Sequence, residues 1–425
     1  MRTLLFTIFS FCYISSQAQT VIADSLRVPI GVEIDAQGRA WVVESGYGFN
    51  DGAVSLVQSN GDVWPVIVGL PSLFDTVNQE GVGPWHTLPL PGNRLAVTEG
   101  ATGQVLIFDL NGFTPGLSAP LTMSNVLFAL NIAEFAVGQG IMESDPYSMA
   151  LDESSNLYVA DAAANAIIKV TPVGQMSIFA TFPATPNPLP FGPPMVDAVP
   201  TRIISKPGGG FYVCQLTGFP FLDGAAQIFL VDASGAVSTY AWNLSTLTDM
   251  ALDAVTGDLY ALQFGHFELD PNLPPGFAPN SARVTRIKPN GAQEVVLENF
   301  GPSAGLTLDA QGNLYTTHIA TGEVLKWNNI TTASHDIKAA VEDLSIAPNP
   351  ATTQARISFS LPVASDVQLR IFNAQGQLVH SQNLGRLPEG AHQTEWIPGA
   401  ACSSGIYQVE VVTERGRAAL VLVKA

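Results

Sequence analysis

Short apolar runs alternate with turn residues along most of the chain, and one such pattern recurs six times. In residues 154–170, "SSNLYVADAAANAIIKV", two apolar runs flank a turn of small residues, which predicts two antiparallel strands. The aromatic Tyr158 lies twelve residues after Pro146 and three before Asp161. The same frame, with one extra residue in the fifth copy, starts at Pro29, Pro84, Pro146, Pro200, Leu247 and Ser303.

Each copy of the frame predicts four antiparallel strands. Turns rich in Gly, Asn and Asp, such as "DAQGR" and "DESSN", separate the first strand from the second. A third strand follows, as in "IIKVT", and most copies then pass a second turn into a fourth strand such as "MSIFATF". Because the central residues of these copies are 48 to 62 residues apart, we predict an all-β fold, a six-bladed β-propeller. A β-sandwich would not repeat one frame six times, and Kelch and WD40 motifs are absent.

The two ends of the repeat region predict how the ring closes. The sixth copy has no fourth strand after "EVLKWNNI", whereas "TVIADSLRVP" near the N-terminus has the pattern of a fourth strand followed by the Pro. We therefore expect the N-terminal strand to complete the sixth blade, which leaves no strand edge unpaired.

Long insertions fall almost entirely on one predicted face of the disc. Strand alternation puts the second-to-third turns and the inter-blade connections on one face, which we call the loop-rich face, and the short turns on the other. The insertions are residues 44–53, 113–146, 182–200, 216–227 and 264–281. Within them, "NVLFALNIAEFAVGQG" has helical spacing and predicts a short helix across the channel mouth. Long ordered loops favour a binding face over loops that only cover the ring.

Three sets of side chains on this side are candidates for function. The second strand of each blade ends in a polar residue, which either bonds the next turn or forms a ring that holds a ligand or metal: Glu44, Glu99, Asp161, Gln215, Gln263 and His318. Two residues after the blade starts come His86, Arg202 and Asp249, which we interpret as catalytic candidates for acid–base chemistry or as ligand-orienting groups. An ion pair between Arg202 and Asp249 with a purely structural role is the alternative. Further ligand-binding candidates are Trp85, Tyr147, Phe219 and Phe221.

Composition restricts the partners and the compartment. The formal net charge of −18 argues against nucleic acid and anionic membrane surfaces as partners. Residues 1–18 have the charge, apolar run and small residues of a secretory signal peptide cut after Ala18, with a membrane span as the alternative. No other apolar run approaches membrane length, so no transmembrane segment is predicted in the mature chain. Cys12 leaves with the signal peptide, and Cys214 and Cys402 are too far apart in sequence to predict a disulfide or a cysteine metal site.

The propeller region resembles a known family. "ESDPYSMALDESSNLYVADAAANAIIKVTP", "VPTRIIS" and above all "LTGFPFLDGAAQIFLV" are similar to the ScyD/ScyE family over about residues 20–330, which implies a secreted or periplasmic propeller. More broadly the frame resembles NHL-type and gluconolactonase/regucalcin-type propellers. In the latter, acidic or amide residues just after the Pro hold a catalytic divalent metal. None of the matching residues is of that kind: Ile30, Trp85, Tyr147, Thr201, Thr248 and Ala304. No cofactor is therefore predicted, and a divalent cation at the channel mouth is the alternative.

From Leu344 the pattern changes to apolar–polar alternation with Gly-rich turns, which predicts a small Ig-like β-sandwich over 344–425. The module resembles the type A C-terminal sorting domain of the type IX secretion system in Bacteroidetes. The matching marks are Pro348–Asn349–Pro350, the hairpin around Gly376, "EGAHQTEW", "SGIYQVEV" and Lys424. This resemblance implies export by the type IX machinery, with the protein released or attached to the cell surface. An Ig-like adhesion module is the alternative.

The sequence thus predicts a signal peptide at 1–18, the propeller at 19–330, a linker with the cleavage region at 331–343, and the sandwich at 344–425. Three hypotheses of function stay open. The first is a secreted or surface-attached propeller that binds a small molecule or glycan on its loop-rich face. The second is a metal-independent or atypical lyase or hydrolase, and the third is a scaffold for protein partners. No nucleophile elbow, zinc-binding helix, phosphate loop or calcium loop decides whether the protein is an enzyme.

Overall fold

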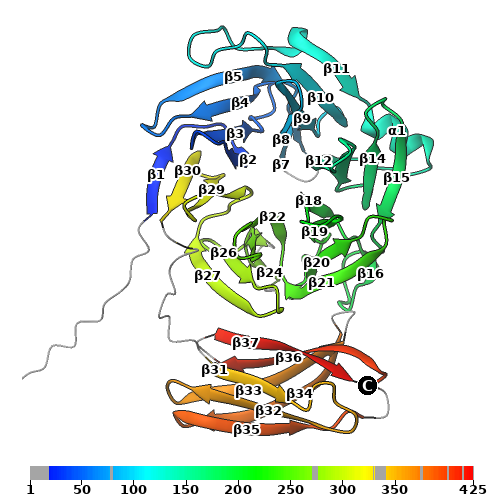
Figure 1. Cartoon of the computed structure of the whole chain (residues 1–425), viewed down its shortest axis with the longest axis vertical. Helices are drawn as coiled ribbons and strands as arrows, with labels where there is room; N and C mark the ends of the chain where they lie inside the picture. Colours follow the sequence, from blue (N-terminus) through cyan, green and yellow to red (C-terminus); the bar gives the residue numbers. More distant parts are fainter. Residues whose placement is uncertain are drawn as a thin grey trace, which may run out of the picture.

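The structure is a computed structural model of the chain (Figure 1). It describes residues 19–76, 80–269, 276–328, 330, 341–373, 377–399, 402–413 and 416–424. The expected signal peptide, most of the expected linker and the hairpin residue Gly376 lie outside these ranges.

Six sheets of four antiparallel strands form a β-propeller, which confirms the predicted fold (Figure 1). The first three blades are β2 (Pro29–Ile34), β3 (Ala40–Glu44), β4 (Gly52–Val57) and β5 (Val63–Leu70); β8 (Pro84–Leu90), β9 (Arg94–Glu99), β10 (Gln104–Asp109) and β11 (Val126–Leu130); and β12 (Pro146–Leu151), β13 (Leu157–Asp161), β14 (Ala166–Val170) and β15 (Met176–Thr181). The other three are β18 (Pro200–Ser205), β19 (Phe211–Gln215), β20 (Ala226–Val231) and β21 (Val237–Leu244); β22 (Leu247–Leu252), β23 (Leu259–Gln263), β26 (Ala282–Ile287) and β27 (Gln293–Phe300); and β28 (Leu306–Leu308), β29 (Leu314–His318), β30 (Glu323–Trp327) and β1 (Gln19–Ala23).

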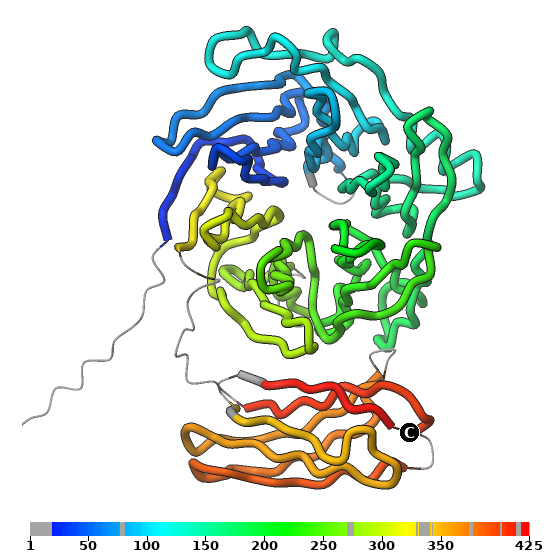
Figure 2. Tube along the Cα trace, in the orientation of Figure 1, coloured from blue at the N-terminus to red at the C-terminus, as the bar shows by residue number. Residues whose placement is uncertain are grey.

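The ring closes as the sequence predicts. Strand β1 pairs antiparallel with β30, with Gln19 opposite Trp327 and Val21 opposite Leu325. Figure 2 shows the N-terminal strand in blue beside the yellow strands of the sixth blade. The inner strands β2, β8, β12, β18, β22 and β28 contact one another in this order around the channel, and β28 contacts β2. Closure in this way leaves no inner strand without a neighbouring blade.

A β-bulge near the start of five inner strands sets which side chains reach the channel. The ladder between β2 and β3 shifts register between Pro29 and Val32, and β8, β12, β18 and β22 shift at the corresponding place. An extra residue in one strand re-aims the side chains around it. The two residues that follow the blade start are therefore placed in the same way in these five blades.

The insertions add small elements to the ring. Three two-stranded hairpins are formed by β6 (Leu73–Asp75) and β7 (Glu80–Val82), β16 (Thr185–Pro186) and β17 (Met195–Val196), and β24 (Phe267–Glu268) and β25 (Gly276–Phe277). A 3₁₀ turn, η1, covers Met123–Asn125. These hairpins belong to the connections of the loop-rich face. The expectation that all of 113–146 lies on that face is wrong, because residues 110–125 connect β10 to β11 and third-to-fourth connections lie on the short-turn face.

The helix expected across the channel mouth is shorter than predicted and lies elsewhere. Residues Val126–Leu130 form the outer strand β11 because they pair with the free edge of β10, and only Ile132–Gly138 is helical, as α1. Ile132 and Ala136 of this helix are buried in the core between the second and third blades. The helix lies at the rim of the ring rather than over the channel (Figure 1).

The C-terminal region forms a second domain of two sheets. One contains β31 (Glu342–Ala347), β32 (Ala355–Leu361) and β35 (Gly390–Trp396), and the other β34 (Leu378–Leu387), β33 (Ser365–Asn373), β36 (Gly405–Thr413) and β37 (Gly416–Lys424). Alternate residues of β32 and β33 are buried in a core of its own, which includes Leu369, Trp396 and Val409. The domain contacts the propeller where Asn243 Nδ2 donates to Glu410 Oε1 and where β27 contacts β37. In the described residues of both domains, no helix has the length and apolar character of a membrane span.

Candidate functional site

The polar residues that end the second strands mostly bond nearby backbone. The Asp161 carboxylate accepts from the N–H groups of Asp145 at 2.7 Å and Ala164 at 3.1 Å. Glu44 accepts from the Arg27 N–H at 2.8 Å, and Gln215 and Gln263 each donate to a carbonyl of the following loop. His318 instead contacts the Thr321 hydroxyl. These contacts support the turn-bonding interpretation for Glu44, Asp161, Gln215 and Gln263.

Glu99 differs from the other strand-end residues because one of its oxygens is unsatisfied. Its Oε1 accepts from the Ala101 N–H at 3.0 Å, whereas Oε2 is buried and has no hydrogen-bond partner among the described residues. Burial, with a smaller effect of the nearby Asp145 carboxylate, raises the pKa of Glu99 to about 8. Glu99 therefore keeps its proton at neutral pH.

The loop-rich end of the channel is filled by apolar side chains. Ile30, Tyr147 and Ala304, each directly after or close to a blade start, are buried and pack together with Trp85. The Trp85 and Tyr147 rings are 5.5 Å apart, and Trp85 Nε1 donates to Asp145 Oδ1 at 2.7 Å. We call these four residues the apolar seal. They occupy four of the six positions where the resemblance to lactonases would place metal ligands.

Thr201 and Thr248 occupy the other two positions and bond to the next blade. Thr201 Oγ1 donates to the Leu247 carbonyl at 2.9 Å, and Thr248 Oγ1 donates to the Ser303 carbonyl at 3.3 Å. Within the described ranges, no group of three or more His, Cys, Asp or Glu residues is arranged to hold a metal ion.

The residues one position further along join each blade to the next. Ser148 Oγ donates to the Thr201 carbonyl at 2.5 Å and accepts from the Ile203 N–H at 3.0 Å. His86 Nδ1 lies 3.0 Å from the Tyr147 carbonyl oxygen. A Cβ atom on Gly305 would lie 2.1 Å from the Ile30 carbonyl oxygen, so this position requires glycine. The repeat position that sequence singles out for chemistry thus also holds the ring together.

The three catalytic candidates meet beneath the seal and are joined by a fourth residue that sequence reasoning did not select. Asp249 Oδ1 lies 3.1 Å from Arg202 Nε, and Asp249 Oδ2 lies 3.6 Å from His86 Nε2. Arg202 also forms an ion pair with Glu33, which belongs to the blade opposite its own. We call His86, Arg202, Asp249 and Glu33 the charged cluster. A polar residue two places after Gly31 on the same strand is the signal that could have pointed to Glu33.

Hydrogen bonds hold the Asp249 carboxylate in place, and the neighbouring carboxylates favour the charged form of Arg202. The Asp249 carboxylate also accepts from the N–H groups of Met250 and Leu306, each at 2.8 Å. Burial alone would lower the pKa of the Arg202 guanidinium, but the carboxylates of Glu33 and Asp249 raise it above its ordinary value. His86 Nε2 is buried and has no hydrogen-bond partner among the described residues.

The one buried thiol near the cluster is not activated. Cys214 and Cys402 are both free thiols, and Cys214 is fully buried. Burial raises the pKa of Cys214 to about 12, and its sulfur lies 3.3 Å from Thr201 Oγ1. A thiol in this state does not supply a nucleophilic thiolate at neutral pH.

A cavity of about 400 Å³ lies at the other end of the charged cluster, on the short-turn face. It is formed where β2, β8, β12 and β18 end, so it opens away from the loop-rich face. Its lining includes Glu33, Trp41, Leu88, Met149, Arg202 and Ile204. Glu33 and Arg202 are therefore accessible from this side, while Asp249 and His86 lie behind them with side chains about 1% exposed.

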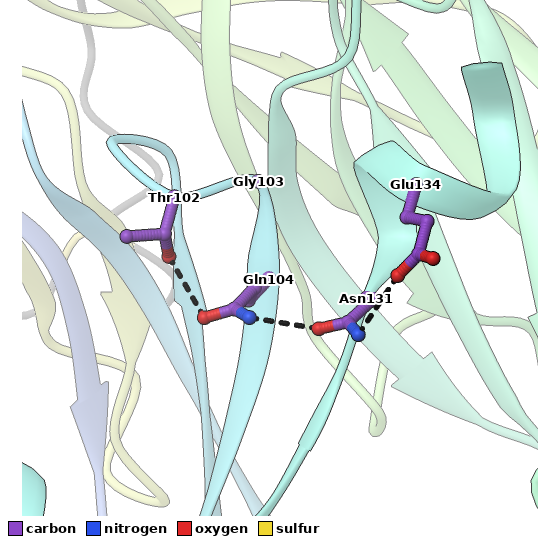
Figure 3. Close-up of a pocket in the computed structure, with 5 residues that line it drawn as sticks. All are labelled: Thr102, Gly103, Gln104, Asn131 and Glu134. Carbon is purple, nitrogen blue, oxygen red and sulfur yellow. Dashed lines mark hydrogen bonds between the residues drawn. The ribbon is translucent and has the colours of Figure 1, made fainter.

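A second, shallow pocket at the edge of the second blade is a hydrogen-bonded helix start (Figure 3). Thr102 Oγ1 donates to Gln104 Oε1 at 3.1 Å, Gln104 Nε2 to Asn131 Oδ1 at 2.7 Å, and Asn131 Nδ2 to Glu134 Oε2 at 3.1 Å. Because each polar group bonds the next, we assign this pocket a structural role at the start of α1.

The loop-rich face carries a cluster of phenylalanines from three insertions. The Phe219 ring lies 6.5 Å from Phe191, 6.3 Å from Phe221 and 6.1 Å from Phe267, and Phe277 packs 5.1 Å from Phe267. Phe219 is 40% exposed and Phe191 is 45% exposed. The two predicted residues Phe219 and Phe221 are thus brought together, far along the chain from Trp85 and Tyr147 of the seal.

The two domains are similar to different known proteins. The family model of the FlgD Ig-like domain matches residues 347–417. The propeller is similar to virginiamycin B lyase from Staphylococcus aureus (12% identity, 73% of this chain and 97% of that chain, TM-score 0.46) and to a glucose dehydrogenase (14%, 73% and 99%, 0.49). It is also similar to a gluconolactonase from Xanthomonas campestris (11%, 72% and 88%, 0.46).

At identities of 11 to 14% and TM-scores below 0.5, these likenesses say nothing about the activity or the substrate of this chain. Among curated proteins, no sequence matches the chain. The sheet order and the contacts between inner strands make the described part of the chain a six-bladed β-propeller, and the family model identifies the domain after it as Ig-like.

Proposed function

We propose that the protein is a secreted or surface-attached propeller of the ScyD/ScyE type that binds a small molecule or glycan on its loop-rich face. The observation that carries this proposal is the phenylalanine cluster of Phe191, Phe219, Phe221, Phe267 and Phe277. It contains the loop "GFPFLDG", which is also the most specific part of the family resemblance.

The arrangement of the cluster suits a ligand with an apolar face. Phe221, Phe267 and Phe277 pack mutually at 5.0 to 5.5 Å and support Phe219, whose ring is 40% exposed. Aromatic rings held rigidly by their neighbours lose little entropy when a ligand stacks on them. Sugar rings and planar aromatic compounds both present apolar faces of this kind, and partly exposed aromatic patches commonly mark binding sites.

A binding screen with matched variants tests this site. The purified chain is titrated calorimetrically with a panel of oligosaccharides and planar phenolic compounds, and hits are repeated on Phe219→Ala and Val255→Ala. Val255 is 94% exposed on the short-turn face, so Val255→Ala removes an apolar group from the other side. We expect a hit to weaken at least about tenfold in Phe219→Ala, a loss of about 1.4 kcal/mol, and to be unchanged in Val255→Ala. Ligands that bind Phe219→Ala as tightly as wild type, or a panel in which no compound binds, would contradict the proposal.

We further propose that the C-terminal domain directs export by the type IX secretion machinery. Its separate core and its match to an Ig-like model support an independent folding unit, and the sequence marks around Pro348–Asn349–Pro350 and Lys424 support the sorting role. In a bacterium that has this machinery, the full chain should reach the surface or the medium, and a chain lacking residues 341–425 should stay in the periplasm. Equal export of both chains would refute the sorting role.

A lyase or hydrolase activity of the charged cluster has less support. His86 Nε2 lies 3.6 Å from Asp249 Oδ2, which is longer than a hydrogen bond, and both side chains are about 1% exposed and lie beneath the apolar seal. A scaffold for protein partners would use the same loop-rich face. In that case Phe219→Ala would lose binding of a protein partner rather than of a small ligand.

A further inference from the structure

The cavity on the short-turn face has the form of a small-molecule site separate from the proposed one. Its volume of about 400 Å³ lies within the ordinary range for ligand pockets. Apolar side chains, among them Leu88, Leu95, Met149, Ile203 and Ile204, form most of its wall. The other lining residues include Glu33, Asp35, Arg202, Thr87 and Ser205, of which Glu33 and Arg202 contact each other. Apolar walls with a few charged groups at one point are typical of sites that orient one end of a ligand.

The charges at this point favour a cation over an anion. Arg202 faces two carboxylates, Glu33 and Asp249, so with a neutral His86 imidazole the charged cluster has one carboxylate more than its single guanidinium compensates. Asp35 does not change this balance because Arg39 Nε lies 2.7 Å from its carboxylate. A negative ligand would therefore meet an already negative site, whereas an ammonium group would neutralise it.

Glu33 is the carboxylate that a ligand can reach. Its side chain is 30% exposed, whereas that of Asp249 is 1% exposed. Arg202 contacts Glu33 Oε1, and the other oxygen, Oε2, accepts only a long bond of 3.4 Å from Thr307 Oγ1 within the described part of the chain. An ammonium group can donate to Oε2 without displacing Arg202, because Arg202 is also held by Asp249 at 3.1 Å.

Trp41 adds a second feature that selects a cation. Its indole forms part of the cavity wall and is fixed by Nε1, which donates to Asp35 Oδ2 at 3.1 Å. A fixed aromatic face beside a carboxylate attracts ammonium groups through the cation–π interaction, and indole does so best among the aromatic side chains.

We propose that the short-turn cavity binds a small organic amine, with the ammonium group at Glu33 and Trp41 and the apolar body against Leu88, Met149 and Ile204. This site lies at the opposite end of the channel from the phenylalanine cluster and does not depend on the function proposed for that cluster.

Two probes that share an indole ring and a two-carbon side chain but carry opposite charges test the site. Tryptamine and indole-3-propionate are titrated calorimetrically into the full chain at pH 7. We expect tryptamine to bind and indole-3-propionate to bind at least tenfold more weakly. Glu33→Gln should weaken tryptamine at least tenfold, and Glu298→Gln, which changes an exposed carboxylate on the outer strand β27, should not.

A cavity-filling variant keeps the test decisive if Glu33→Gln folds poorly. Ile204→Trp places a large ring in the cavity from β18 and leaves the ion pairs intact, so it should abolish tryptamine binding. Phe219→Ala should leave tryptamine binding unchanged, which separates this site from the loop-rich face. Equal binding of both probes, no binding of tryptamine to wild type, or full binding by Ile204→Trp would overturn the proposal.

Discussion

The two ends of the propeller channel are built in opposite ways. At the loop-rich end, where the inner strands begin, Ile30, Trp85, Tyr147 and Ala304 pack into the apolar seal. At the short-turn end, the same strands finish around a cavity that reaches Glu33 and Arg202. The end that carries most of the long insertions is closed by these apolar side chains, whereas the opposite end has the cavity.

This difference shows that loop length and channel access are separate properties. The insertions supply an outer surface, the phenylalanine cluster, while the apolar seal, which follows four of the six blade starts, separates that surface from the charged cluster. Polar residues near the channel are accessible only where the side chains around them leave space, and this happens beyond Arg202 rather than before it. The following predictions test the contrast between the two ends, from the largest effect to the smallest.

Removal of Asp249 should have the largest effect because it is the buried centre of the charged cluster. Asp249→Ala leaves the Arg202 guanidinium with one carboxylate and the Leu306 N–H without its acceptor. We expect the free energy of unfolding to fall by about 3 to 5 kcal/mol, measured by urea denaturation. As a control, Glu294→Ala removes an exposed partner of Lys288 and should cost less than about 0.5 kcal/mol. Equal costs for both variants would mean that the cluster does not support the ring.

Crowding the contact between the sixth and first blades should have the next largest effect. The Cβ atom of Gly305→Ala would lie 2.1 Å from the Ile30 carbonyl oxygen, which is backbone and cannot rotate away. We expect a loss of about 2 to 3 kcal/mol. Gly138→Ala, at the end of α1, meets no atom within 4 Å and should be neutral or slightly stabilising in the same denaturation experiment. A harmless Gly305→Ala would show that the blades are less closely fitted at the sealed end than the structure indicates.

Glu99 should make the loop-rich end sensitive to pH. Its pKa rises from the ordinary value of 4.5 to about 8 in the folded protein, so between these values the folded chain keeps a proton that the unfolded chain releases. Stability from this group is therefore full below about pH 4.5 and is lost as the pH rises towards 8. Glu99→Gln, which resembles the protonated form, should gain a few kcal/mol over wild type at pH 8 and less than about 1 kcal/mol at pH 5.

Thermal unfolding of wild type and Glu99→Gln across this pH range measures the difference. Glu298→Gln serves as the exposed control and should follow the wild-type curve. A Glu99→Gln curve parallel to wild type would show that Glu99 is ionised throughout and that its surroundings are more polar than the described contacts.

Local patterns were sufficient to predict the fold. The apolar–polar alternation, the turn residues and the recurring frame predicted each blade, and the strand-like residues 20–29 predicted closure by the N-terminus. The helix expected within 125–140 was misplaced because Val126–Leu130 pairs with an edge strand that lies twenty residues away in sequence. A pairing partner outside the local window overrides the helical spacing.

The candidate site was predictable only in part. The repeat position shared by His86, Arg202 and Asp249 was visible in the sequence, and the structure brings the three together. Glu33 was missed because it lies 169 residues from Arg202 and reaches it only across a closed ring. The sequence also could not predict from which end of the channel the charged cluster is accessible, because this depends on how neighbouring side chains fill the channel.

The sequence by itself determined what depends on neighbouring residues: strands, turns, their sixfold repetition and the separate C-terminal sandwich. These follow from side-chain periodicity and backbone preferences, which act over a few residues. Only the tertiary structure decided which end of the channel is sealed, which charges meet and where a cavity is left. Those features depend on distances between blades that are remote in sequence, and such distances are fixed only when the ring has closed.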